Sequence, residues 1–365
     1  MKQPIQRAVL ATLTLAAGLS SAAAAADNAP ATESRPVAAF SKIELDVPYD
    51  VTVTAQGAPA VDLSGPRKLF ANIDTTVVGD TLVVRSHQHA GFNFHFGKRA
   101  PQALIHITLP ALSSLKAAGS GDVTLERYQG DQLELNLTGA GDLRAAGQSQ
   151  LLKLHVGGSG DADLRQLKTA SLNLRFDGAG DVKAGGITRS LDADLSGSGD
   201  FDAGELHASH VAMLMHGAGG VKLAGSGQEL RVEVSGSGDF DACALSADSV
   251  TALLRGAGNA CVAGNIKKFD AEIHGSGDLT ARGLQTQTAR VQLTSAGNLS
   301  LSGSTAALNA EMTGSGDLDA RQLLTGHADV VVRGPGSAVV NLQAKSGNNE
   351  HSHLLTIDRS GTHNE

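Results

Sequence analysis

The sequence predicts a parallel β-helix, and three observations support this fold class. A short motif, first seen as Gly119-Ser120-Gly121-Asp122, recurs in twelve copies whose spacing alternates between 20 and 19 residues. A fixed short period indicates a solenoid, in which each repeat buries its apolar face against its neighbours. On both sides of the motif apolar residues alternate with other residues, which is the period of a strand with one buried face. Glycine is also abundant, at 44 of 365 residues, which suits tight turns better than helices.

The first 26 residues read as a signal peptide. Lys2 and Arg7 give a positive start, Ala8–Leu19 is apolar, and Ala22–Ala26 supplies small residues for cleavage. The apolar stretch is too short to span a bilayer, and no later stretch approaches the length of a transmembrane segment. We therefore expect an exported protein, in the periplasm or at the cell surface or outer membrane, with residues 27–36 as a linker.

Composition argues against several classes of partner. Without Lys2 and Arg7, the 29 basic residues fall to 27 against 37 acidic ones, a net charge of −10. Such a charge disfavours nucleic acid and anionic membranes. Aromatic residues make up only 3% and there is no Trp, which disfavours a sugar-stacking surface.

The alternation divides the rest of the chain into three parts. Residues 37–110 are expected to form irregular β-rich coils, and residues 111–344 a regular β-helix of about twelve coils. Each coil reads as strand, Gly-rich turn, strand and a looser second turn such as Ala146–Ser149. Residues 345–365 are expected to be a polar tail.

The aspartates of the Gly-x-Gly-Asp turns should stack into a column. We interpret them as turn caps, in which each carboxylate accepts backbone N–H bonds of its own turn. Asn259, Asn298 and Ser337 replace aspartate in later coils and can do the same. The alternative is a calcium-binding β-roll, although such a roll has a nine-residue repeat. The members of the column are Asp122, Asp142, Asp161, Asp181, Asp200, Asp239, Asp278 and Asp317.

A second column, five residues after each motif start, alternates in charge from coil to coil. Opposite charges on neighbouring strands attract, so this ladder predicts that the coils are stacked in register. The alternation also offers a reason for a true repeat of 39 residues, made of two unlike coils. The members of the ladder are Arg144, Asp163, Lys183, Asp202, Lys222 and Asp241.

Two cysteines, Cys243 and Cys261, lie in adjacent repeats of a chain expected to be exported. Regular stacking would place their Cα atoms about 8 Å apart, slightly beyond the reach of a disulfide. The sequence leaves a bridge and two free thiols both open.

Two further patterns could carry chemistry. His87, His89 and His95 form a candidate metal site, since His-x-His on a strand places both rings on one face, although a polar loop explains them as well. Paired aspartates such as Asp161 and Asp163 could serve a polysaccharide-cleaving site. No Ser-His-Asp or Cys-His arrangement and no phosphate-binding loop is recognisable in the sequence.

Three segments resemble the bacterial head GIN domain family of auto-transporter adhesins. They are Phe40–Val53, Gly79–Val84 and Ile107–Leu115, which leads into the first Gly-Ser-Gly-Asp turn. The resemblance covers roughly residues 37 to 340 and implies an exported β-helical domain with an adhesin label. Nothing in the chain resembles an outer-membrane translocator barrel.

Together these features predict a non-enzymatic, exported β-helix with a structural or adhesive role at the cell envelope. The alternatives are a polysaccharide-binding or polysaccharide-cleaving β-helix and a calcium-binding β-roll. We expect no cofactor, no nucleic acid and no transmembrane segment. The partner stays open, with a cell-surface or polysaccharide ligand as the candidate.

Overall fold

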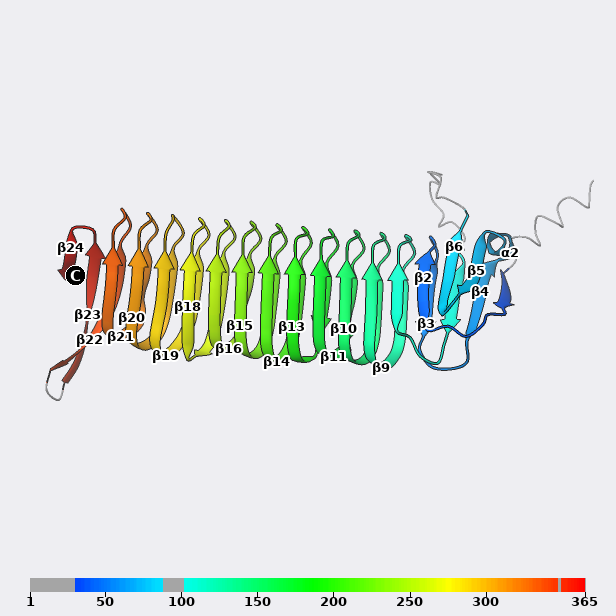
Figure 1. The fold of residues 1–365 in the computed structure, drawn as a ribbon, viewed down its shortest axis with the longest axis horizontal. Coiled ribbons are helices and arrows are strands. Elements are labelled where there is room, and N and C mark those ends of the chain that lie inside the picture. Colours follow the sequence, from blue (N-terminus) through cyan, green and yellow to red (C-terminus); the bar gives the residue numbers. More distant parts are fainter. Residues whose placement is uncertain (1–29, 88–101, 347–348, 365) are drawn as a thin grey trace, which may run out of the picture.

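A computed structural model of the chain describes residues 30–87, 102–346 and 349–364. They form a β-solenoid of about 11 turns, in which 70% of the residues are in strands and 1% in helix. Figure 1 shows the coils stacked along one axis, with tight turns along one edge and broad bends along the other. The predicted parallel β-helix is confirmed.

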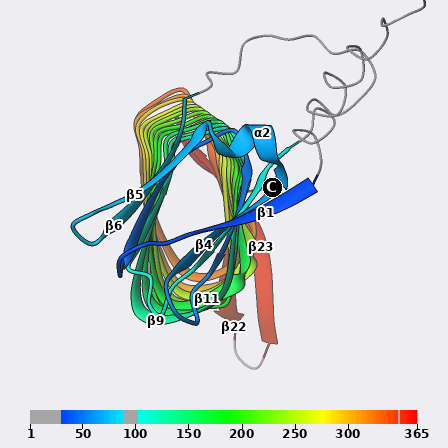
Figure 2. The ribbon, with the colours of Figure 1, turned by 90° about the vertical axis from the view of Figure 1, so that its right-hand side faces the viewer.

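Most coils consist of one long strand that bends in the middle. We call wall B the layer formed by the first halves, such as Leu143–Ala145, and wall A the layer formed by the second halves, such as Leu152–Val156. Figure 2 looks along the axis and shows the two walls facing each other. The long strands are β9 (Val123–Leu137), β10 (Leu143–Val156), β11 (Ala162–Phe176), β14 (Phe201–Met215), β15 (Val221–Val234), β16 (Phe240–Leu254), β19 (Leu279–Leu293), β20 (Leu299–Met312) and β21 (Leu318–Val332). Two coils are split at the bend, into β12 (Val182–Gly185) with β13 (Ile187–Leu195) and into β17 (Ala260–Ile266) with β18 (Lys268–Ile273).

Successive coils pair in parallel and in register, so that equivalent apolar residues stack. Leu133 lies opposite Leu152, and Leu152 lies opposite Leu172. All three are at most 1% exposed. The core is therefore a set of columns of like side chains between the two walls, and burial of these columns supplies most of the stabilisation.

The broad bend explains the 39-residue repeat in a way that the sequence analysis missed. Coils of one kind place a large apolar residue at the bend, and coils of the other kind place a glycine with positive φ. Gly225 lies between Leu206 and Leu245, and both leucines are fully buried. A Cβ on Gly225 would lie 2.2 Å from the Leu206 carbonyl oxygen. Large and small residues therefore alternate along this corner.

The first strands continue both walls beyond the regular coils. Wall A is continued by β8 (Ser114–Ala117), β2 (Lys42–Asp46), β6 (Thr81–Ser86) and β5 (Ile73–Val78). Wall B is continued by β3 (Asp50–Thr54), β7 (Leu104–Thr108), β4 (Ala60–Pro66) and β1 (Pro30–Arg35). The short helix α2 (Arg67–Phe70) buries Phe70 at this end.

The linker expected over residues 27–36 contains the strand β1, which corrects that expectation. Pro30–Arg35 pairs antiparallel with β4, and the Arg35 guanidinium donates to the carbonyl oxygens of Phe70 (2.8 Å) and Ile73 (2.7 Å). These contacts over long sequence distances hold the strand in the sheet, and no local pattern in the sequence announces them. Residues 27–29 and the expected signal peptide lie outside the described residues.

Cys243 and Cys261 form a disulfide between adjacent coils, with a Cα–Cα distance of 5.3 Å. The regular spacing that suggested about 8 Å does not hold here, because the register of β16 against β17 shifts between Ala242 and Ser246. The question that the sequence left open is thus resolved in favour of the bridge.

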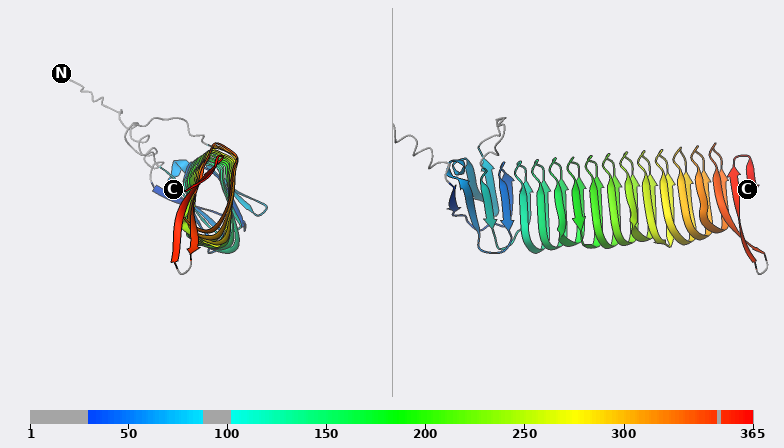
Figure 3. Two further views of the ribbon diagram at one scale, coloured as in Figure 1. Left: turned by 90° about the vertical axis from the view of Figure 1, so that its left-hand side faces the viewer. Right: turned by 180° about the vertical axis from the view of Figure 1, so that it is seen from behind.

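The other end of the solenoid differs from the prediction in two ways. The twelfth motif opens β22 (Ala338–Ser346), but this strand leaves the coil instead of returning along wall A. The expected polar tail contains β23 (Asn349–Asp358) and β24 (Gly361–Asn364), which continue wall B as antiparallel strands. Figure 3 shows the β22–β23 hairpin projecting beyond the edge of the coils.

The corner packing yields a prediction about stability. Gly225→Ala should lower the free energy of unfolding by at least about 2 kcal/mol, because the methyl group meets backbone atoms of Leu206 and φ is +132°. Gly204→Ala is the matched control, since no atom lies within 4 Å of its Cβ position. It should change stability by less than about 1 kcal/mol. Equal losses in denaturant titrations would contradict the alternation of large and small residues at this corner.

Candidate functional site: the aspartate column and the outer face of wall A

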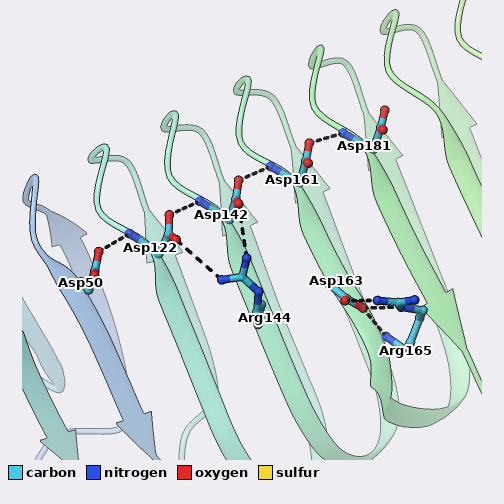
Figure 4. A network of polar contacts seen from close by, with 8 residues as sticks. All are labelled: Asp50, Asp122, Asp142, Arg144, Asp161, Asp163, Arg165 and Asp181. Atoms are coloured by element: carbon cyan, nitrogen blue, oxygen red, sulfur yellow. Dashed lines mark hydrogen bonds and ion pairs between the residues drawn. The ribbon is translucent and has the colours of Figure 1, made fainter.

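The aspartates of the tight turns form a chain of hydrogen bonds from coil to coil, part of which is drawn in Figure 4. The backbone N–H of Asp142 donates to Asp122 Oδ1 (3.0 Å), and the N–H of Asp161 donates to Asp142 Oδ1 (3.1 Å). Further bonds of the same kind involve Asp181 with Asp161 (2.8 Å), Asp200 with Asp181 (3.0 Å), Asn259 with Asp239 (2.8 Å), Asn298 with Asp278 (2.9 Å) and Ser337 with Asp317 (2.8 Å).

This geometry corrects the expected role of the column. Each of these carboxylates accepts an N–H from the next coil, whereas the sequence suggested an N–H of its own turn. The tight turn lies between the parallel strand pairs of wall A and those of wall B. At this position the aspartate side chain links adjacent turns by a hydrogen bond. The column therefore joins neighbouring coils and does not merely shape single turns.

The structure adds one member and shows one gap. Asp50 Oδ1 accepts the Asp122 N–H (3.3 Å), which extends the column into the irregular coils. Sequence reasoning missed Asp50 because its turn has no Gly-x-Gly; the Asp-Val pair shared with Asp122-Val123 is the signal that could have found it. Gly220 donates to Asp200 (2.8 Å) but has no side chain to accept the next N–H.

Residues of the predicted charge ladder are register partners, as in the pairs Arg144–Asp163 and Lys183–Asp202. Their side chains make other contacts. Arg144 lies 3.6 Å from the carboxylates of both Asp122 and Asp142. Among the described residues no ion pair joins two successive members of the ladder.

Two of the three aspartates of the ladder, Asp163 and Asp241, have a local role instead. Asp163 Oδ1 accepts the backbone N–H of Arg165 (3.2 Å), and Asp241 Oδ1 accepts that of Cys243 (3.0 Å). Such bonds two residues along initiate a bend. The hydrogen bond from the Arg165 side chain lowers the pKa of Asp163. The 39-residue period thus reflects the bend as well as alternating charge.

The histidine hypothesis can be followed for one residue only. His87 makes an ion-pair contact with Asp74 near the start of the solenoid. His89 and His95 lie outside the described residues. Within the described ranges, the one group of three close potential metal ligands is Asp241, Cys243 and Cys261, and its two sulfur atoms are joined in the disulfide.

The outer face of wall A carries a long groove. Two columns of outward side chains, five and three residues before each tight turn, form its sides. Leu154, Leu174 and Met213, which belong to the core between the walls, also contribute to its floor. This first groove has a volume of about 660 Å³ and runs from Glu134 on β9 to Glu233 on β15. A second groove of about 560 Å³ continues on the same face from Asp270 to Arg333.

The two grooves differ in how many of their charged side chains form ion pairs. In the second groove Arg290 pairs with Asp270 (3.5 Å), and Arg333 pairs with Glu311. In the first groove several exposed charged side chains make no ion pair with any described residue. They are Glu134, Lys153, Asp192, Asp194 and Arg231. The first groove therefore offers free charges of both signs above an apolar floor, which is the arrangement a ligand can use.

The aspartate column yields a second prediction. Asp161→Ala leaves the Asp181 N–H without its acceptor and should cost about 1 to 3 kcal/mol of stability. Asp161→Asn should cost much less, because Asn259 and Asn298 accept the equivalent bonds in this chain (3.0 and 2.9 Å). Denaturant titrations would measure both. If the asparagine variant lost as much as the alanine variant, the charge of the column rather than its hydrogen bonds would be the stabilising feature.

A family model described as "Putative auto-transporter adhesin, head GIN domain" matches residues 39–221, 208–283 and 262–347. No curated protein matches. Solved structures include a putative adhesin of Bacteroides fragilis (18% identity, 83% of this chain and 97% of that one, TM-score 0.28) and one of Parabacteroides merdae (14%, 87% and 96%, 0.32). Another is a putative adhesin of Parabacteroides distasonis (14%, 84% and 98%, 0.32). The family model covers most of the chain, so this protein belongs to the head GIN domain family that the model describes.

Proposed function

We propose that this protein is an exported, non-enzymatic β-solenoid with an adhesive or structural role at the bacterial cell envelope. The ligand binds along the outer face of wall A. The observation that carries this proposal is the first groove, with its apolar floor and free charges of both signs spread over several coils. The adhesin description of the family supports the same class of role.

Such a surface favours many weak contacts over one strong one. Lys153 and Arg231 lie several coils apart, and Asp192 and Asp194 lie between them. A linear cell-surface polymer can contact all these coils at once, and its affinity then grows with the number of coils engaged. The low aromatic content argues against stacking on sugar rings, so the contacts to such a polymer would be polar and aliphatic.

The carboxylate pairs that suggested polysaccharide cleavage have structural contacts. Asp161 Oδ1 accepts the Asp181 N–H, and Asp163 binds Arg165 through both backbone and side chain. A general acid or base must exchange its proton freely with substrate. These engagements support a binding role over a catalytic one for this pair.

A deletion of one 39-residue unit tests the extended surface. Removing Gly197–Ser235 keeps the register but takes two coils from the first groove, so binding of the labelled protein to bacterial cell envelopes should fall in a graded way. Removing Gly275–Thr313 is the matched control, because it shortens the second groove, where Arg290 pairs with Asp270 and Arg333 pairs with Glu311. It should have a much smaller effect.

Two outcomes would contradict the proposal. One is equal loss of binding in both deletions. The other is evidence for a point site. Such evidence would be complete loss of envelope binding in Asp200→Ala with the fold intact, or release of product from pectin or alginate by the purified protein. Either result of the second kind would favour an enzyme with a point site.

Export has its own test. Within the described residues, no helix has the length and apolar character that a membrane crossing requires. Expression of the full chain in a Gram-negative host should place the protein in the periplasmic or outer-membrane fraction, with a new N-terminus near Asp27. Recovery of uncleaved protein from the cytoplasm would contradict the export part of the proposal.

A further inference from the structure

The two walls end at different points beyond the last complete coil. On wall B, β22, β23 and β24 follow the first half of β21. On wall A, the second half of β21 is the last described strand, and no described strand pairs with it beyond Thr325 on its outer side. Figure 2 shows β23 on the same side as β1 and β4, opposite β5 and β6. Wall B therefore overhangs wall A by three strands.

The notch left on wall A exposes the end of the core. Ala328, Val330 and Val332 are only partly buried, whereas Ala310 and Met312, which precede Val330 and Val332 in the stack, are 5% and 0% exposed. On the overhang, Leu355 and Ile357 continue the inward column of Val340 and Ala338 and are also only partly buried. Apolar surface of this kind at an open end favours association.

Two backbone edges are open as well. Among the described strands, the second half of β21 pairs with β20 on one side only, and β24 pairs with β23 on one side only. Unpaired strand edges are sites for pairing with another chain. Both edges lie at the same end of the solenoid, one on each wall.

We propose that two copies of this chain join at this end as a two-fold symmetric dimer. A two-fold axis parallel to the strands and midway between the walls exchanges wall A with wall B. The three-strand overhang of each copy then enters the notch of the other. The rotation preserves strand direction, so β24 of the second copy meets the second half of β21 as an antiparallel neighbour. The contact is isologous and closed.

The opposite end of the solenoid supports this choice of occupant. There four strands extend wall A (β8, β2, β6 and β5) and four extend wall B (β3, β7, β4 and β1). An end at which both walls extend equally cannot fill a notch that lies on one wall only. A head-to-tail filament would leave the notch open, whereas a second copy of the uneven end is its own complement.

Variants on two neighbouring positions test the dimer. Val330 points into the notch and Val331, which is 40% exposed, points outward on the same strand. Val330→Asp would bury an unpaired carboxylate in the dimer and should weaken dimerisation about 100-fold or more, while Val331→Asp should leave it nearly unchanged. Ile357→Asp, on the overhang, should act like Val330→Asp and is the second variant in case the first fails to fold.

Sedimentation equilibrium of the purified protein would give the association constant, with circular dichroism as the check on folding. Small-angle scattering should show that the dimer has an unchanged cross-section and nearly twice the length of the monomer. The proposal is overturned if the wild-type protein is monomeric over a hundredfold range of concentration, about 1 to 100 μM. A dimer of monomer length, or one that folded Val330→Asp and Ile357→Asp form as tightly as wild type, also overturns it.

Discussion

Close stacking of one tight turn on the next is the constraint on which the rest of the structure depends. A Cβ at Gly139 would lie 1.9 Å from the carbonyl oxygen of Gly119, and a Cβ at Gly158 would lie 1.9 Å from that of Gly139. An approach this close at Gly139 and Gly158 requires a residue without a Cβ atom. Because the turns stack at this spacing, the strands that enter and leave them stay in register. The aspartate column, the core columns and the outer columns of wall A all follow from that register.

The regular part of this fold could be predicted from the sequence, whereas features that depend on contacts between coils could not. The period and the alternation around residues such as Leu152 are local patterns, and they predicted the walls and the core. The role of Asp142 could not be read in the same way, because an aspartate in a turn can bond its own turn or the next one with the same sequence. The Cys243–Cys261 bridge depended on a bulge, which no spacing rule supplied.

The candidate site was hidden for a related reason. The conspicuous motifs of the sequence are the charged residues at the turns and along wall B. The groove on wall A depends on outward residues such as Lys153 and Asp194, which vary from coil to coil and form no motif. Only the stacked structure shows that they share one face. The strands β1, β23 and β24 were missed likewise, because short polar segments become strands when an existing sheet edge offers them partners.

The repeating unit of this architecture is two coils, because large and small residues alternate at the bend. Gly225 fits between Leu206 and Leu245, and Gly303 fits between Leu284 and Leu323. Loss of a single coil would bring two leucines or two glycines together, which would either overfill the corner or leave it empty. Loss or gain of two coils preserves the alternation. The length of the solenoid, and with it the number of contacts along wall A, can therefore change in steps of 39 residues without altering the cross-section or the two ends.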